Sequence, residues 1–222
     1  SGKRCKRVSS FGALTLFKKE RAPKGAALRC IDCGVKENCP YDAEKIYITN
    51  KKTGVAEGNN QWPCDVLDLN PTVESIREAI KTGPYGRCVY HCDNDVVDRQ
   101  VVNLEFDNGA VAGFTMTAFT TDMARQLKVC GTKGQITADM NANTDSLHRF
   151  GESGPREITL ETPPQTNNYG HGGGDYYLMR DFVRAVQSGS DGNLSSARVS
   201  LQSHLICFAA ERSRVERRIV EL

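Results

Sequence analysis

Three cysteines lie close together in the sequence with the spacing of a metal site. Cys30, Cys33 and Cys39 form a C-x-x-C-x5-C pattern. Two thiolates at that spacing can chelate one tetrahedral zinc ion, and a third nearby can supply another ligand. A fourth ligand would come from elsewhere in the chain, and the candidates are Cys5, Cys64, His91 and Cys92. Such a site would hold together a long loop that has no core of its own.

The same cysteines allow other interpretations. Free thiols often pack as small hydrophobic side chains, and two of them could instead form a disulfide. A C-x-x-C pair can also be redox-active, although here it does not open a helix in a β-α-β pattern. Because no second C-x-x-C pair is present, the pattern leaves these alternatives open beside zinc.

A glycine-rich segment before a predicted helix is a second candidate site. Residues 169–175 read Tyr-Gly-His-Gly-Gly-Gly-Asp. Glycines let a ligand approach the backbone, and the first N–H groups of a helix can bind an anion or a hydroxyl group. His171 can donate or accept a hydrogen bond, and Asp175 can cap the helix. The pattern favours a loop that faces a ligand over the alternative of a linker ending in a helix cap.

A third candidate lies in residues 85–98. Alternation with period two would place Cys88, Tyr90 and Cys92 on one face of a strand. Polar residues that include Asn94 follow, where they could hold a hydroxylated substrate. Segments rich in Asn and Asp are also common in ordinary turns, so both interpretations stay open.

Composition excludes several classes of protein. The chain has 222 residues, with 29 Lys and Arg against 27 Asp and Glu, and this net charge of +2 indicates neither a nucleic-acid partner nor an anionic membrane. No stretch approaches the roughly 20 apolar residues of a membrane-spanning helix. The nine cysteines are odd in number and no signal peptide precedes them, which favours reduced thiols in the cytoplasm over a secreted disulfide scaffold.

These candidate residues require elements that can position them, and the sequence predicts an α+β fold. It predicts a mainly antiparallel open sheet with helices on one face, within a single domain over residues 1–222. The strongest signal is a hairpin, in which Asn108-Gly109 forms a two-residue turn that places Phe106 opposite Val111. Further expected elements are an extended segment over 5–17, a short helix opened by Pro40, strands over 46–49 and 157–160, a hairpin over 127–137, and helices from Thr72, Asp175 and Ser195 or Ser196.

Both faces of the 101–118 hairpin carry apolar side chains. One face would hold Val102 and Leu104, and the other Val101 and Phe114. A sheet with helices on one side leaves its second face exposed, so we expect a partner chain or domain there. No strand followed by a G-x-G-x-x-G turn occurs, so we expect no dinucleotide site in this chain.

Several of these motifs, in this order, resemble the C-terminal domain of the Gfo/Idh/MocA oxidoreductase family. The resemblance covers nearly the whole chain, and the segment from Arg29 to Tyr41 is similar to an insert in one branch of the family. The motifs that carry the resemblance are residues 83–98, Asn108-Gly109, residues 131–134 and residues 170–176.

The resemblance implies a two-domain NAD(P)-dependent dehydrogenase that acts on a sugar or a polyol. This chain would be its substrate-binding and oligomerisation domain, with the N-terminal Rossmann domain absent and the fragment inactive alone. The family's catalytic residues would lie outside the chain, so none is assigned here. By position, Tyr90, Asn94, His171 and Asp175 match regions that line the substrate pocket in relatives. The alternative function is a non-enzymatic interaction module, held together by zinc, that dimerises through its sheet.

Overall fold

The computed structural model describes residues 1–222 except 1–2, 122–124, 140–143, 159–173 and 190–195. The strands are β1 (Cys5–Ala13), β2 (Arg99–Phe106), β3 (Val111–Thr117), β4 (Gln126–Gly131), β5 (Gly134–Asp139), β6 (Thr144–Arg149), β7 (Arg156–Ile158) and β8 (Val220–Glu221). The α-helices are α1 (Val73–Thr82), α2 (Gly174–Ser188) and α3 (Ala197–Glu216). Shorter helical turns are Lys19–Arg21, Lys36–Asn38, Lys45–Thr49, Val55–Glu57, Cys64–Val66 and Pro84–Gly86.

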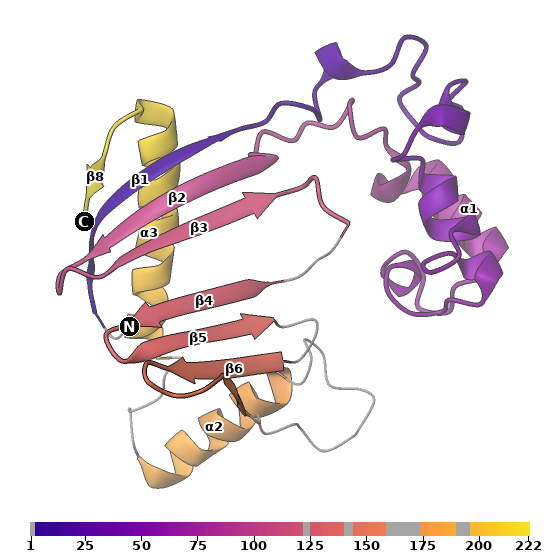
Figure 1. The fold of residues 1–222 in the computed structure, drawn as a ribbon. Coiled ribbons are helices and arrows are strands. Elements are labelled where there is room, and N and C mark those ends of the chain that lie inside the picture. Colours follow the sequence, from indigo (N-terminus) through magenta and orange to yellow (C-terminus); the bar gives the residue numbers. More distant parts are fainter. Residues whose placement is uncertain (1–2, 122–124, 140–143, 159–173, 190–195) are drawn as a thin grey trace. The chain divides into compact units, whose positions relative to one another are not determined.

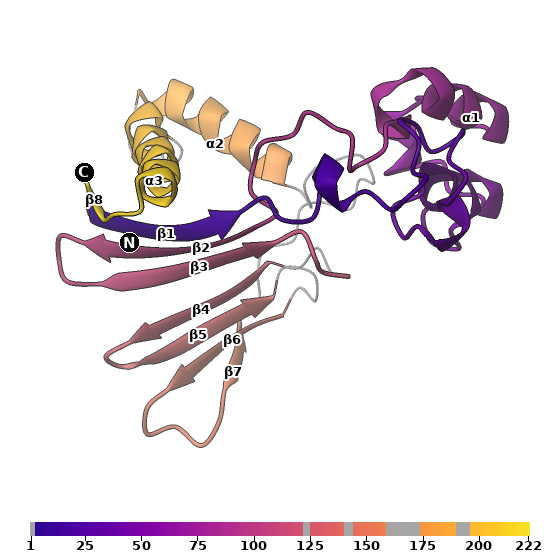
Figure 2. The same cartoon turned by 90° about the horizontal axis from the view of Figure 1, so that it is seen from above.

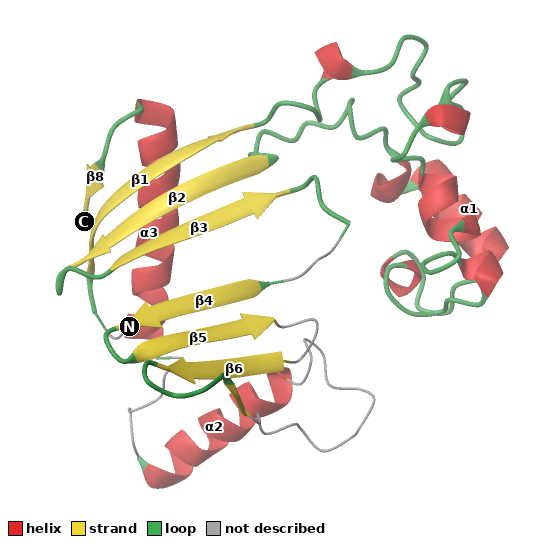
Figure 3. Ribbon diagram, in the orientation of Figure 1, coloured by secondary structure: helices red, strands yellow, loops and turns green. Residues whose placement is uncertain are grey.

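The strands form two sheets of four, in the orders β3-β2-β1-β8 and β4-β5-β6-β7 (Figure 1). The strands of the second sheet pair antiparallel, and β8 pairs antiparallel with β1. Strands dominate the middle of the chain and helices its end (Figure 3). The predicted α+β class with mainly antiparallel pairing is confirmed, although the strands divide between two sheets.

Helix α3 covers one face of the first sheet (Figure 2). Period-two alternation turns Val8, Val102 and Val220 toward the helix, where they bury against Ala209 and Ala210. Leu104, Phe106 and Ile206 pack at the edge of this core. The small alanine side chains of α3 let the helix approach the sheet closely. A few buried apolar residues are therefore enough to hold helix and sheet together.

The hairpin between β2 and β3 forms, but its predicted turn is wrong. The Gly109 N–H donates to the Phe106 carbonyl oxygen at 3.0 Å, and the Phe106 N–H donates to Ala110 at 2.9 Å. Gly109 has a φ of 82°, whereas Asn108 does not adopt the positive φ that a two-residue primed turn requires. Phe106 therefore pairs with Ala110 across a three-residue loop. The shift by one residue moves the β3 side chains to opposite faces, and Val111 is 79% exposed.

The hairpin of β4 and β5 and the last two helices follow the prediction closely, whereas strand β6 (Thr144–Arg149) was not predicted. Strands β4 and β5 meet at the pair Gly131 and Gly134, as expected from the glycines. Helix α3 begins after Ser196, whose hydroxyl accepts a hydrogen bond from the Val199 N–H at 3.4 Å. Strand β7 covers only Arg156–Ile158, and the rest of the predicted strand lies outside the described residues.

Residues 14–98 form few regular elements apart from α1. That helix begins where predicted, and Thr72 and Ser75 form a reciprocal capping box that the sequence did not indicate. The predicted strand at 46–49 is wrong, because Lys45–Thr49 is a π-helical turn. The helix expected from Pro40 begins later, at residue 43, because Asp42 caps it through the Lys45 N–H.

The chain divides into two compact units with separate cores. Unit 1 comprises residues 1–10, 102–113 and 119–222, and unit 2 comprises residues 11–101 and 114–118. The core of unit 2 is formed by buried side chains that include Ile48, Cys64, Ile76 and Ile80. The assignment of residues 1–222 to a single domain stays a prediction. Among the described residues, no helix is both long enough and apolar enough to cross a membrane.

Candidate functional site

A small cavity in unit 2 brings together cysteines from two distant segments. Its volume is about 20 Å³, which is room for a single water molecule or ion. The walls include all three cysteines of the C-x-x-C-x5-C pattern, and Cys88 is a fourth. The remaining lining residues are Pro23, Ala26, Val35, Lys36, Tyr41, Asp42, Val89 and Tyr90.

A short antiparallel contact explains how Cys88 reaches the pattern. Arg29 and Arg87 form an isolated β-bridge. On either side of it, the Cys30 N–H donates to the Gly86 carbonyl oxygen and the Cys88 N–H donates to Leu28, both at 2.9 Å. Side chains that flank a bridging residue point to the same face of the pair. Cys30 and Cys88 therefore face the same side.

Successive tight turns place the other two cysteines. The Cys33 N–H donates to the Cys30 carbonyl oxygen at 3.1 Å, and the Cys39 N–H donates to Lys36 at 3.0 Å. Each bond closes a three-residue step, so the chain winds back on itself between residues 30 and 39. These turns bring Cys33 and Cys39 to the same cavity as Cys30.

Burial favours the neutral thiol form of the two most buried cysteines of the cavity wall. Cys30 and Cys88 are 7% and 8% exposed. Desolvation raises the pKa of both thiols above the ordinary value for cysteine, and the neighbouring Cys39 adds to the rise at each of them. The Cys30 thiol points toward the Tyr41 carbonyl oxygen at 4.0 Å, which is a weak contact.

The zinc site expected at Cys30, Cys33 and Cys39 is not formed in this structure. Within the described residues, no three His, Cys, Asp or Glu side chains are grouped so as to hold a metal ion. All nine cysteines are free thiols, which also leaves the predicted disulfide alternative without support. The cysteines line one cavity, but their sulfur atoms are not grouped as metal ligands.

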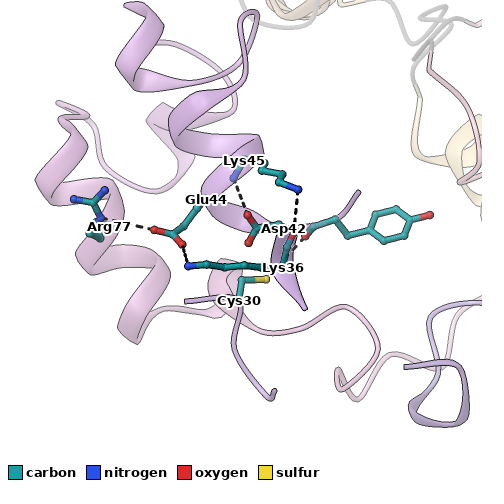
Figure 4. Close-up of polar contacts among 7 residues, drawn as sticks. Cys30, Lys36, Asp42, Glu44, Lys45 and Arg77 are labelled. Carbon is teal, nitrogen blue, oxygen red and sulfur yellow. Dashed lines mark hydrogen bonds and ion pairs between the residues drawn. The ribbon is translucent and has the colours of Figure 1, made fainter. Parts of the chain in front are cut away.

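Charged side chains surround the segment that carries the cysteines (Figure 4). Lys36 pairs with Glu44 at 2.5 Å, and Arg77 of α1 lies 3.8 Å from the same carboxylate. The hydrogen bond with Glu44 raises the pKa of Lys36. The Lys45 ammonium donates to the carbonyl oxygens of Lys36, at 3.0 Å, and Glu37. The pair of Glu44 with Arg77 links this segment to α1, and the other bonds hold residues 36–45 together.

Asp42 is the buried charged residue of the cavity wall. It is 3% exposed, and its Oδ2 accepts a hydrogen bond from the Lys45 N–H at 3.2 Å. Its Oδ1 has no hydrogen-bond partner in the protein. A buried carboxylate oxygen without a partner is costly, so something outside the described contacts is expected to compensate it.

Tyr90, predicted to contact substrate, is packed among other aromatic rings. Its ring centroid lies 6.1 Å from that of Tyr41 and 6.5 Å from that of Phe17. Phe17 and Tyr41 meet edge to face at 5.2 Å. Tyr90 is buried, and desolvation raises the pKa of its hydroxyl. The ring thus forms part of the cavity wall, while its role toward a substrate stays a prediction.

The strand expected through Cys88, Tyr90 and Cys92 does not form. Residues 84–86 make a helical turn, and the His91 N–H donates to the Cys88 carbonyl oxygen at 2.9 Å within a further turn. The exposed Asn94 accepts a hydrogen bond from the Val96 N–H at 3.2 Å through its side-chain oxygen. Asn94 therefore occupies the Asn-rich turn that was the alternative interpretation.

The remaining predicted site residues are His171 and Asp175. His171 lies outside the described residues. Asp175 is exposed in the first turn of α2 in unit 1, whereas Tyr90 and Asn94 belong to unit 2. Sequence reasoning placed Cys88 on a strand face and did not bring it to the other cysteines, and it did not single out Asp42. The available signal for Asp42 was its position three residues before Lys45, at the start of a helical turn.

Comparison with a family of known sequences gives a match over most of the chain. The family is described as "Oxidoreductase family, C-terminal alpha/beta domain" of the Gfo/Idh/MocA group, and the match covers residues 52–222. The search of curated proteins found no match.

Two solved structures share the fold with this chain at low sequence identity. An aldose-aldose oxidoreductase from Caulobacter crescentus, complexed with glycerol, has a TM-score of 0.51 and 12% identity, covering 100% of this chain and 42% of that one. A levoglucosan dehydrogenase in its apo form has a TM-score of 0.50 and 21% identity, covering 58% and 37%. An oxidoreductase domain protein from Kribbella flavida has a TM-score of 0.46 and 26% identity, covering 57% and 38%. The chain spans less than half the length of each of these proteins.

Proposed function

Because the chain belongs to the Gfo/Idh/MocA oxidoreductase family through its C-terminal alpha/beta domain, we propose that it is the substrate-binding and oligomerisation domain of an NAD(P)-dependent oxidoreductase. The substrate class is a sugar or a polyol. The family match over residues 52–222 is the observation that carries the proposal. The two proteins that share the fold carry sugar substrates in their names, which agrees with this class but shows only the fold.

The nucleotide belongs to another part of the oxidoreductase. Dinucleotide sites use a parallel β-α-β unit with a glycine-rich turn at the helix N-terminus. In the described part of the chain, the pairings within the second sheet and between β1 and β8 are antiparallel, and this arrangement does not fit such a cofactor. A nicotinamide would supply hydride transfer, and we assign no residue of this chain to holding it and no step to it.

The proposed substrate contacts are Tyr90, Asn94, His171 and Asp175, by their positions in the family motifs. Hydroxyl, amide, imidazole and carboxylate groups suit a polyhydroxylated ligand because each can exchange hydrogen bonds with its hydroxyl groups. Asn94 and Asp175 are both exposed and so can reach a ligand. Tyr90 is buried, so the proposal requires its hydroxyl to contact substrate at the edge of the aromatic cluster.

The oligomer surface is proposed to be the face of the first sheet opposite α3. This face is less apolar than the sequence predicted, because the one-residue shift replaces Phe114 with Val111 and the ion pair Arg7–Glu105, at 2.7 Å, lies there. Light scattering coupled to gel filtration measures the oligomeric state of the chain directly. We expect an assembly larger than a monomer, which Val111→Glu should weaken because it adds a charge to a surface that the assembly would bury. A monomer across the accessible concentration range contradicts this part of the proposal.

Ligand binding tests the substrate class. Saturation-transfer NMR of this chain with a panel of aldoses and cyclic polyols should show contacts for at least one member. Asn94→Ala and Asp175→Asn should weaken the signal, whereas Asp95→Asn, an exposed neighbour in the same turn, should leave it unchanged. If every sugar and polyol fails to bind, both to this chain and to the product of the complete reading frame, the proposed substrate class is wrong.

Calorimetry tests where the nucleotide binds. We expect no micromolar binding of NADH or NADPH to this chain, and binding of one of them to the product of the complete reading frame. Micromolar binding to the chain alone would contradict the proposal that the nucleotide binds to another part of the oxidoreductase.

A cytoplasmic location, which the nine free thiols favour, is part of the same proposal and is checked by fractionation of the source cells.

A further inference from the structure

The cysteine cavity has the composition and size of a site for one soft metal ion. Four thiols line it, from Cys30, Cys33, Cys39 and Cys88. A volume of about 20 Å³ accepts one atom of water size but not a multi-atom cluster or an organic cofactor. Sulfur ligands select zinc and similar soft cations, and structural zinc sites use four protein ligands.

Asp42 gives an independent reason to expect a cation there. Its carboxylate lines the same cavity and is 3% exposed, and Oδ1 has no partner in the protein. Lys36, the cation of the cavity wall, is paired with Glu44 at 2.5 Å. A buried carboxylate oxygen without a hydrogen-bond partner is unfavourable in an empty cavity, and a divalent cation bound there would attract it.

We propose that Cys30, Cys33, Cys39 and Cys88 bind one zinc ion in this cavity. Cys88 is the fourth ligand, in place of the candidates that the spacing of the sequence suggested. The site is structural, because four protein ligands leave no open position for a substrate. It would join the 30–42 loop to the 84–90 segment, which already meet at the bridge between Arg29 and Arg87 and at the rings of Tyr41 and Tyr90.

Binding requires the thiols to turn toward the cavity centre, because no three ligands converge in the arrangement seen among the described residues. Each cysteine has one side-chain torsion with three staggered positions, so a change of rotamer moves the sulfur by roughly 3 Å without moving the backbone. The contact that holds Cys30, with the Tyr41 carbonyl oxygen at 4.0 Å, is weak and easily given up.

Metal titration of the reduced, chelator-free protein tests the proposal. Competition with a chromophoric chelator should give one zinc per chain, and Co²⁺ in its place should show the absorption of a tetrahedral thiolate complex. Cys88→Ser should lower zinc affinity by at least about 100-fold, beyond the effect expected from losing an outer contact. The matched control is Cys92→Ser in the same segment, because Cys92 does not line the cavity and its thiol donates to the Cys88 carbonyl oxygen.

Three outcomes overturn the proposal. One is less than about a tenth of an equivalent of zinc bound per chain at micromolar metal. Another is a cobalt spectrum without thiolate character. The third is a loss of affinity in Cys92→Ser that equals the loss in Cys88→Ser. If Cys88→Ser does not fold, Cys39→Ser replaces it, since Cys39 is less buried and lines the same wall.

Thermal unfolding with and without zinc gives a second measurement. Wild-type protein and Cys92→Ser should gain melting temperature with added zinc, and Cys88→Ser should not. Neither measurement involves a sugar or a nucleotide, so failure of the metal site leaves the proposed oxidoreductase function untouched, and the reverse also holds.

Discussion

Asp98 shows how a single buried carboxylate fixes the point where β1 leaves the sheet. Its carboxylate accepts hydrogen bonds from the Thr15 N–H at 2.6 Å and the Leu16 N–H at 2.7 Å. The Thr15 hydroxyl adds a third donor at 3.0 Å. Burial raises the pKa of Asp98, but the hydrogen bonds from Leu16 and Thr15 outweigh burial and hold this pKa below its ordinary value.

We predict that Asp98→Asn destabilises the fold by about 2 kcal/mol at pH 7, because an amide cannot replace the charge-assisted bonds to these N–H groups. A lowered folded-state pKa contributes stability above the unfolded-state pKa of about 3.9, and this contribution is lost as pH falls through the folded value. The difference in unfolding free energy between wild type and Asp98→Asn, measured with urea, should therefore become smaller in acid. Asp95→Asn is the exposed control, and a gap that widens below pH 4 contradicts the role of the charge.

The spacing of cysteines in the sequence identifies some residues of the cavity and not others. Cys30, Cys33 and Cys39 were visible as candidates because a short pattern keeps its members close in any fold. Cys88 was not, because its place opposite Cys30 depends on the bridge between Arg29 and Arg87, which are far apart in sequence. Asn94 was compatible with both a strand end and a turn, and only the bond to the Val96 N–H decides between them.

At the scale of elements, Gly86 controls how the segment that carries Cys88 meets α1. A Cβ at this position would lie 1.6 Å from the Ile80 carbonyl oxygen, near the end of that helix. The Arg29 guanidinium donates to the same oxygen at 2.7 Å, and the Gly86 carbonyl oxygen accepts from the Cys30 N–H at 2.9 Å. The close approach is therefore part of the contact that aligns the two cysteine segments.

We predict that Gly86→Ala costs at least about 3 kcal/mol of unfolding free energy, because rigid backbone, not a flexible side chain, blocks the added methyl group. Gly34→Ala is the control, since a Cβ there meets nothing within 4 Å, and its effect should stay within about 0.5 kcal/mol. Chemical denaturation of both variants measures the difference. Equal stability of the two variants would mean that the turn at 84–86 moves freely away from α1.

The backbone at the end of α3 is strained at Arg217, which the sequence analysis did not predict. Arg217 adopts the left-handed conformation, with φ 56° and ψ 41°, and its N–H donates to the Ser213 carbonyl oxygen. The Ser213 hydroxyl, buried, donates to the Arg218 carbonyl oxygen at 2.6 Å and accepts from the Ser10 N–H at 2.9 Å. The helix end must therefore turn at Arg217 to bring β8 beside β1.

We predict that Arg217→Gly raises stability by about 0.5 kcal/mol, since relief of about 1–2 kcal/mol of strain exceeds the entropy that glycine adds to the unfolded chain. Arg212→Gly, in the exposed interior of the same helix, should instead cost about 1 kcal/mol. Urea midpoints of the two variants should move in opposite directions. Loss of stability in both would show that the left-handed position carries no strain that glycine can relieve.

The elements also divide into those that sequence periodicity could predict and those that it could not. Helices α1, α2 and α3 and the two hairpins were predictable because their apolar residues repeat at helical or strand spacing. The register of β2 and β3 was not, because Asn108-Gly109 fits both a two-residue and a three-residue loop. The π-helical turn at 45–49 was taken for a strand over 46–49, because a β-prone run of four residues is too short to show a period.

At the scale of the whole chain, the two units are held by cores that share no residue. In unit 1, Val8, Val102 and Val220 pack against α3, and in unit 2, Ile76 and Ile80 of α1 pack on Ile48 and Cys64. Each unit therefore has its own source of hydrophobic stability. The family match begins at residue 52, inside unit 2, so the division into units does not follow the boundary of the matched domain.

Separate cores predict separate responses to mutation. The single tryptophan, Trp62, lies in unit 2, whereas α2 and α3, which dominate the far-UV circular dichroism, lie in unit 1. Ile76→Ala should cost about 2–5 kcal/mol and lower the denaturant midpoint seen by tryptophan fluorescence, while Val8→Ala should lower the midpoint seen by circular dichroism. Because the two sites share no packing partner, the double variant should show both shifts with little coupling. If each single variant moves both signals by the same amount, the units unfold as one cooperative body and the independence of their cores does not hold.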